Sequence, residues 1–228
     1  MQVALALFPG VSADECEAFT HVFDQLPDAE LVGVGAVLGP VVGPGGGHRV
    51  DATFDNVQHP DVVLVPGGIG CVRAAGDEAL LGWLRAVAPR CEWMAASSTG
   101  TVIVAAAGLL GDHEAATHWL AGDLLESYGS PASSERIVEV GRIITCEGRI
   151  TAMHVALLVT LRIAGPGAVA RVRAGLARVD PPDARPPHRW VRRVAVRSSR
   201  RAKGPPRPRN RELDAPDEIE FDPITRRW

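Results

Sequence analysis

The stretch Glu92–Trp119, EWMAASSTGTVIVAAAGLLGDHEAATHW, decides the fold of this chain. Its first five residues, Glu92–Ala96, predict a short buried strand, and the apolar run that starts at Thr101 is long enough for a helix. The four small residues between them predict a sharp turn from strand to helix. Such a turn presents one residue above the edge of the sheet and directs free backbone N–H groups at whatever binds there.

The turn itself has the form small-x-Ser-x-Gly, with Ser98 at its centre. This form is close to the G-x-S-x-G nucleophile elbow, in which small flanking residues permit a tight turn around a reactive serine. The alternative is that Ser98 is the N-cap of the following helix, a position that serine also favours. The local sequence leaves both interpretations open.

Other segments predict the rest of the fold. Val3–Phe8 and Asp61–Val65 are continuous apolar runs, as expected of central parallel strands. Residues 77–88 form an amphipathic pattern whose expected core face is Leu80, Leu81, Trp83, Leu84 and Val87. Strands that alternate with helices predict an α/β fold, with a doubly wound, mostly parallel sheet and helices on both faces.

Several shorter segments complete this prediction. Residues 29–39 indicate a side strand, and the glycine-rich residues 40–56 indicate a hairpin or loop. Residues 115–117 indicate a short strand, and residues 135–146 indicate two strands around Gly141. A long helix is expected from residue 148 past the Gly165-Pro166-Gly167 sequence, and the domain is expected to span residues 1–182.

Charge sets the C-terminal part apart from the rest. Residues 185–211 hold eleven Arg or Lys residues and no acid, whereas residues 212–222 hold six acids. This proline-rich segment has little apolar periodicity, so we expect residues 183–228 to form a disordered tail that does not join the core. The tail could attach electrostatically to nucleic acid, but a solvated tail is the more common reason for such a charge run.

The composition excludes several classes of protein. The apolar runs fall short of the ~20 residues of a membrane span, and the N-terminus lacks the pattern of a signal peptide, so a cytoplasmic location and no membrane are expected. The four cysteines are scattered, with no C-x-x-C and no ligand-like pairing with histidine. They predict free thiols rather than disulfides or a metal site.

The elbow stretch resembles the corresponding segment of the ThiJ/PfpI superfamily, which has a class I glutamine amidotransferase-like, flavodoxin-like fold. The usual form there is V-C-T-G-(A/S)-x-x-L-A-x-A-G-L-L-x-G-x-x-A-T-T-H-W. The resemblance places the family's nucleophilic cysteine on Ser98. FPGVSADECEAFTHVF, residues 8–23, is also similar to the family's first strand and turn. That similarity places on Glu15 the acid that lies beside the nucleophile.

Glu15 also has a purely local explanation. Ser12 and Glu15 have the spacing of a capping box, in which each side chain bonds the backbone N–H of the other residue at the start of a helix. The two roles predict different partners for the carboxylate.

The resemblance implies further site residues. The backbone N–H groups of Gly68 and Thr99 would form an oxyanion hole, and Gly100 would belong to the same substrate-binding site. His118 matches the family's T-H-W segment, and His154 falls where the family has an aspartate. Each histidine also has a structural explanation, His118 as a satisfied structural residue and His154 as a surface residue near a helix start. No cofactor and no metal are implied.

The resemblance is strongest to the isocyanide-hydratase-like branch, which implies a homodimer and a small-molecule substrate. Two functions remain open. The first is a cofactor-independent hydratase or hydrolase, formally a hydro-lyase or a hydrolase, that uses Ser98 as nucleophile or water-orienting group together with Glu15. The second is an inactive domain that binds a small ligand or partner in a regulatory role, since a serine hydroxyl is far less acidic than a thiol.

Overall fold

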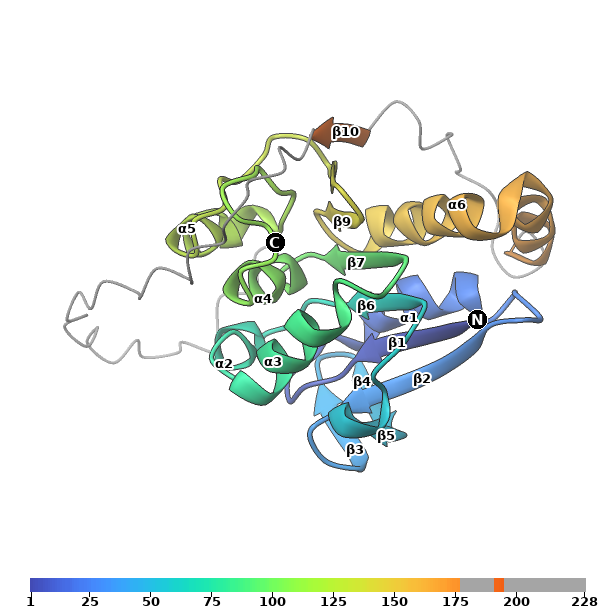
Figure 1. The fold of residues 1–228 in the computed structure, drawn as a ribbon, viewed down its shortest axis with the longest axis horizontal. Coiled ribbons are helices and arrows are strands. Elements are labelled where there is room, and N and C mark those ends of the chain that lie inside the picture. Colours follow the sequence, from blue (N-terminus) through green and yellow to red (C-terminus); the bar gives the residue numbers. More distant parts are fainter. Residues whose placement is uncertain (177–190, 195–228) are drawn as a thin grey trace, which may run out of the picture.

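The computed structural model describes residues 1–176 and 191–194, and its centre is a mostly parallel β-sheet (Figure 1). Seven strands lie in the order β8-β9-β7-β6-β1-β2-β5, and β10 adds to the outer side of β8. Neighbouring strands are parallel except β8 and β9. The bounds are β1 Gln2–Ala6, β2 Glu30–Gly35, β5 Ala52–Thr53, β6 Val62–Val65, β7 Trp93–Ser97, β8 Ile137–Val140, β9 Ile143–Cys146 and β10 Val191–Val194.

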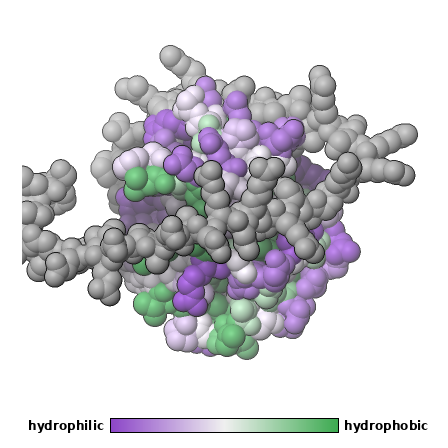
Figure 2. Space-filling model, turned by 90° about the vertical axis from the view of Figure 1, so that its left-hand side faces the viewer, coloured by the Kyte–Doolittle hydropathy of each residue, from purple (hydrophilic) through white to green (hydrophobic). Residues whose placement is uncertain are grey.

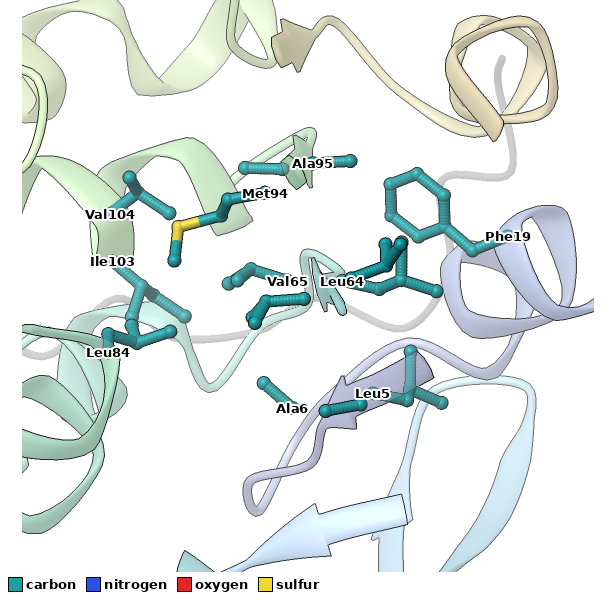
Figure 3. Close-up of a cluster of buried hydrophobic side chains, with 14 of the residues drawn as sticks. Leu5, Ala6, Phe19, Leu64, Val65, Leu84, Met94, Ala95, Ile103 and Val104 are labelled. Atoms are coloured by element: carbon teal, nitrogen blue, oxygen red, sulfur yellow. The ribbon is translucent and has the colours of Figure 1, made fainter. Parts of the chain in front are cut away.

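Helices cover both faces of the sheet, which confirms the doubly wound α/β prediction. Figure 3 shows α3 and α4 on one side of the central strands and α1 on the other. α6 lies on the same side as α1 (Figure 1). The bounds are α1 Ala13–Phe23, α2 Cys71–Ala74, α3 Glu78–Val87, α4 Gly100–Ala106, α5 Gly122–Ser127 and α6 Arg149–Leu176, with 3₁₀ turns η1 Phe54–Asn56 and η2 Trp119–Ala121.

The core is built from the faces that the periodicity predicts. All five residues expected on the core face of α3 are buried. Figure 3 shows Leu84 of α3 beside Ile103 of α4, opposite Val65 and Met94 of the strands. The carboxylate of Asp77 accepts the N–H groups of Ala79 and Leu80 and so caps α3.

Two of the shorter predictions have different outcomes. Residues 40–56 do contain a hairpin, formed by the antiparallel strands β3 Gly39–Gly43 and β4 Gly46–Val50. The prediction of a strand at residues 115–117 is wrong, since only a single bridge joins Ala115 to Ala132. The hydrogen bonds of Ala116 go to side chains instead, because its N–H donates to Thr145 Oγ1 and its C=O accepts from Thr101 Oγ1.

α6 is long and apolar enough to cross a membrane by length and composition alone. The helix is interrupted at Gly165, which has a φ of +75° and is followed by Pro166. Nearly half (44%) of the most apolar stretch of this helix is buried against the rest of the protein. Helices in the core of globular domains have the same pattern, because one face must pack on neighbouring elements.

The prediction that residues 183–228 stay outside the core needs a correction. Val191–Val194 pair in parallel with Ile137–Val140 and form β10. Without β10, β8 would present a row of unpaired backbone N–H and C=O groups at the edge of the sheet. The remainder of the predicted tail, including most of its basic residues, lies outside the described residues.

Candidate functional site

The predicted site lies at the carboxyl ends of the central strands. The chain crosses from β1 outward to β2 and later returns to place β6 on the other side of β1, so the sheet has a topological switch point between β1 and β6. Open α/β sheets bind ligands outside the carboxyl ends at such a point. The loops after β1 and β6 meet there in a bridge between Val11 and Gly68, and the turn after β7 brings Ser98 beside them.

Ser98 has a strained backbone. Its φ is +56°, and no other non-glycine residue in the described part of the chain has a positive φ. The strain is held on two sides, because the Ser98 N–H donates to the Cys146 carbonyl (2.8 Å) and the Ser98 carbonyl accepts from Thr117 Oγ1 (2.9 Å). A strained residue persists only where its surroundings hold it in this way, and such residues cluster at functional sites.

The helix after the turn begins one residue later than the cap alternative requires. Thr99 is the N-cap of α4, so the interpretation of Ser98 as the cap is wrong. Gly100 allows the close approach of α4 to β6. A Cβ atom there would press into the Val65 carbonyl oxygen and lie 2.8 Å from the Pro66 carbonyl oxygen.

Thr99 and Gly68 are joined by two hydrogen bonds. The Gly68 N–H donates to Thr99 Oγ1 (2.9 Å), and the Thr99 hydroxyl lies 3.1 Å from the Gly68 carbonyl oxygen as a donor. The structure thus brings together the two residues predicted for an oxyanion hole. The Gly68 N–H is engaged by Thr99, however, so it can bind an oxyanion only after this bond is released.

Glu15 reaches the elbow from α1, but its partner is Ser97. Ser97 Oγ donates to Glu15 Oε2 over 2.7 Å, and Ser97 is fully buried at the end of β7. We expected Glu15 to bond Ser98. Ser97 is the partner instead, because consecutive side chains of a strand point in opposite directions and only one of the two serines can face Glu15. At Ser98 the chain also leaves the strand, since its φ is positive.

The capping box at Ser12 and Glu15 does not form. Ser12 is the N-cap of α1 but its side chain makes no capping hydrogen bond, and its N–H donates to the Gly67 carbonyl instead. The Glu15 carboxylate is therefore directed to the elbow rather than to its own helix.

Burial raises the pKa of the Glu15 carboxyl above its usual value. Four effects oppose burial and lower this pKa: the Ser97 hydrogen bond, the Arg149 backbone N–H, and the positive charges of His118 and Arg149. A carboxyl with a raised pKa stays protonated to higher pH than an exposed glutamate, which favours a role as a proton donor.

The two predicted histidines lie in different surroundings. His118 is the N-cap of η2, where its Nδ1 accepts the Leu120 N–H, and it lies close enough to Glu15 to act electrostatically on the carboxyl. His154 is half-buried on α6. Burial lowers its pKa, and the charges that lower it further are those of Arg136 and Arg173 rather than any group of the elbow. His118 therefore lies near the Glu15 carboxylate, whereas no contact among the described residues connects His154 with the elbow.

The cysteines are unsuited to nucleophilic chemistry. All four are free and buried. Burial raises the pKa of Cys16 to about 12 and that of Cys91 to about 11, and it also raises the pKa of Cys146. Among the described residues, no group of three or more His, Cys, Asp or Glu side chains could hold a metal ion.

Apolar side chains are exposed on the segments next to the site residues. Ile69 follows Gly68, Trp119 follows His118, and Ile150 follows Arg149; their exposed fractions are 82%, 82% and 66%. Figure 2 looks onto this edge of the sheet and shows apolar patches beside hydrophilic ones. Ser98 itself is only 7% exposed.

Two hollows elsewhere, around Trp83 and around Pro166, are lined by neither Ser98 nor Glu15.

Sequence reasoning missed Ser97. It occurs in a strand that is otherwise apolar, and a buried hydroxyl needs a hydrogen-bond partner. This requirement could have indicated that Ser97 has a polar partner. It could not identify the partner, Glu15, which lies 82 residues earlier in the chain.

Comparison with known proteins gives a consistent result. The sequence model of the DJ-1/PfpI family matches residues 1–160. The isonitrile hydratase of Pseudomonas putida is 31% identical over 166 residues, which cover 72% of this chain and 73% of that enzyme. The HTH-type transcriptional regulator CdhR of Pseudomonas aeruginosa is 29% identical over 137 residues, which cover 59% of this chain but only 40% of the regulator.

Solved structures share the fold. A ThiJ/PfpI family protein from Pseudomonas syringae superposes with a TM-score of 0.74 at 24% identity, covering 80% of this chain and 77% of that one. DJ-1beta of Drosophila melanogaster superposes with a TM-score of 0.69 at 22% identity, covering 77% of this chain and 96% of that one.

Proposed function

Because the chain belongs to the DJ-1/PfpI family, we propose that it is a cofactor-independent small-molecule hydratase or hydrolase that acts through Ser98 and Glu15. The observation that carries this proposal is the strained backbone of Ser98, held at the strand-to-helix turn with the partly buried carboxyl of Glu15 nearby. In this proposal Ser98 occupies the position of the family's nucleophilic cysteine. The similarity to isonitrile hydratase favours isonitriles, R–N≡C, as the substrate class.

Hydration of an isonitrile needs one water and a proton transfer. The terminal carbon forms a bond to the water oxygen and takes a proton from Glu15, while the water returns a proton to the carboxylate. The formimidic acid R–N=CH–OH then tautomerises to the formamide R–NH–CHO. Ser98 either orients the water or attacks first, in which case water releases the product from the serine oxygen.

Glu15 suits the role of proton donor. Its raised pKa keeps the carboxyl protonated to higher pH than an exposed glutamate. The Thr99 N–H, at the start of α4, supports negative charge that develops at the elbow, and the Gly68 N–H joins it if Thr99 Oγ1 releases it.

Replacement of Ser98 tests the proposal directly. We expect wild type to convert isonitriles to formamides, and Ser98→Ala to lower kcat by about 10²–10³-fold, the range for loss of one group that acts in the transition state. The products are measured by chromatography in parallel assays: the formamide from isonitriles, the carboxylic acid from amides and the 2-hydroxy acid from α-oxoaldehydes. Ser134→Ala, at an exposed serine in another loop, is the matched control and should keep full activity.

Two outcomes contradict this proposal. If Ser98→Ala is as active as wild type, Ser98 is not part of the machinery. If wild type converts none of the three compound classes, a ligand-binding role replaces catalysis.

The pH dependence tests Glu15. If the protonated carboxyl is the donor, kcat/KM is constant at low pH and falls as pH rises through the raised pKa of Glu15. Glu15→Gln cannot donate this proton, so we expect a kcat/KM lowered by about 10²-fold or more and no such fall with pH. The rate without enzyme is subtracted at each pH. A profile that rises with pH in the same range would make Glu15 a base instead of an acid.

We also propose that the protein forms a homodimer, as members of the family often do. Sedimentation equilibrium should give twice the mass of the chain. A mass of one chain at micromolar concentration would contradict this proposal.

A further inference from the structure

Ser97 joins its hydroxyl to a carboxylate from a distant element of the fold. It is the last residue of β7, it is fully buried, and its one hydroxyl proton goes to Glu15 Oε2 over 2.7 Å. Short hydrogen bonds to a carboxylate are stronger than those between neutral groups and set its orientation.

The other carboxylate oxygen faces a different element. A Cβ atom added to Gly148 would lie 3.6 Å from Glu15 Oε1, so this oxygen lies against the turn that leads into α6. The backbone N–H of Arg149, the first residue of α6, is close enough to the carboxylate to lower its pKa. Glu15 is thus held between the end of β7 and the start of α6, while its own helix α1 supplies the side chain.

The two adjacent serines therefore have separate environments. Ser97 points to the carboxylate beneath the turn, whereas Ser98 has the strained backbone of the turn itself. Rotation of Glu15 about its terminal bonds would break the Ser97 hydrogen bond inside a buried region. This would leave a buried hydroxyl without a hydrogen-bond partner, which is unfavourable. One orientation of the carboxyl is favoured as a result.

We propose that Ser97 is a positioning residue, whose hydroxyl holds the Glu15 carboxyl in the orientation needed for proton transfer at Ser98. This rests on the proposed function of Glu15 as proton donor. Ser97 is fully buried and acts through Glu15, not on the substrate. The alternative is that Glu15 merely satisfies a buried hydroxyl, in which case Ser97 affects stability alone.

The two explanations differ in the titration of Glu15. The Ser97 hydrogen bond lowers the pKa of this carboxyl, so its loss must raise that pKa further. The other charged or titratable groups that interact with Glu15 are His118 beside η2, Arg149 on α6, Cys16 on α1 and Cys146 on β9. None of them is altered by a substitution at position 97.

The experiment compares Ser97→Ala with Ser97→Thr, which keeps the hydroxyl, and with Ser98→Ala, which removes the neighbouring one. Glu15 is titrated by ¹³C NMR of its carboxyl carbon and assigned by loss of its signal in Glu15→Gln. We expect Ser97→Ala to raise the pKa of Glu15, and Ser97→Thr and Ser98→Ala to leave it near the wild-type value. With an isonitrile substrate, Ser97→Ala should lower kcat by about 10-fold or more with little change in KM, and Ser97→Thr should recover most of it.

The outcomes separate this inference from the proposed function. If Ser97→Ala lowers the melting temperature but leaves the Glu15 titration and kcat unchanged, Ser97 is structural and the inference is wrong. The same holds if the titration moves but kcat does not. If the titration moves as expected while wild type converts no substrate, the contact between Ser97 and Glu15 is supported and the catalytic function fails.

Discussion

Ser98→Cys is expected to create the most reactive thiol in the protein. Position 98 lies between the end of β7 and the N-terminus of α4, and a helix N-terminus stabilises a thiolate. Two native thiols are shifted in the opposite direction, since burial raises the pKa of Cys16 to about 12 and of Cys91 to about 11. At pH 7.5 the ionised fraction of a thiol with an ordinary pKa of about 8.5 is roughly 100-fold or more above that of Cys16 or Cys91. Alkylation of the thiol at position 98 by iodoacetamide should therefore be faster than that of these two thiols by at least about 10².

Alkylation rates against pH measure this effect. Ser134→Cys is the matched control, because residue 134 is exposed and its thiol should titrate as an ordinary one. An activated elbow predicts a lower pKa at position 98 than at position 134. The negative form of Glu15 opposes thiolate formation, but the raised pKa of Glu15 weakens this opposition. A thiol at position 98 that reacts no faster than the native thiols would rule out an activating elbow.

Gly100→Ala is expected to have the largest effect on stability. The added methyl group would press into the Val65 carbonyl oxygen and lie 2.8 Å from the Pro66 carbonyl oxygen, and both belong to buried backbone. Neither β6 nor α4 can move without loss of packing, since β6 lies between β1 and β7 in the middle of the sheet. Overpacking of this kind costs about 3 kcal/mol or more, which corresponds to a melting temperature lower by roughly 6–12 °C in a domain of this size.

Gly82→Ala is the matched control for this substitution. Gly82 lies inside α3, and a Cβ atom there meets nothing within 4 Å. The change to alanine should stabilise the protein by about 0.5–1 kcal/mol, because alanine favours the helix and restricts the unfolded chain. Thermal unfolding followed by circular dichroism measures both variants. Equal melting temperatures for Gly100→Ala and wild type would mean that β6 and α4 can separate.

Local pattern was sufficient to predict most of the fold. The period of apolar residues at positions 77–88 predicted both α3 and its buried face, because a helix places every third or fourth residue on one side. The apolar runs at the N-terminus and at residues 61–65 predicted β1 and β6, since a strand covered by helices on both faces is apolar throughout. Small residues around Ser98 predicted the strand-to-helix turn.

The sequence by itself therefore determined the α/β fold and the place of Ser98 at the strand-to-helix turn, because both follow from periodicity and from residues close together in the chain. Only the tertiary structure decided the partner of Glu15, the engagement of the Gly68 N–H by Thr99 and the addition of β10 beside β8. These contacts join residues 82, 31 and 54 positions apart. Local spacing favoured Ser12 as the partner of Glu15, but folding brings the buried hydroxyl of Ser97 to the carboxylate, and a buried hydroxyl must be hydrogen-bonded.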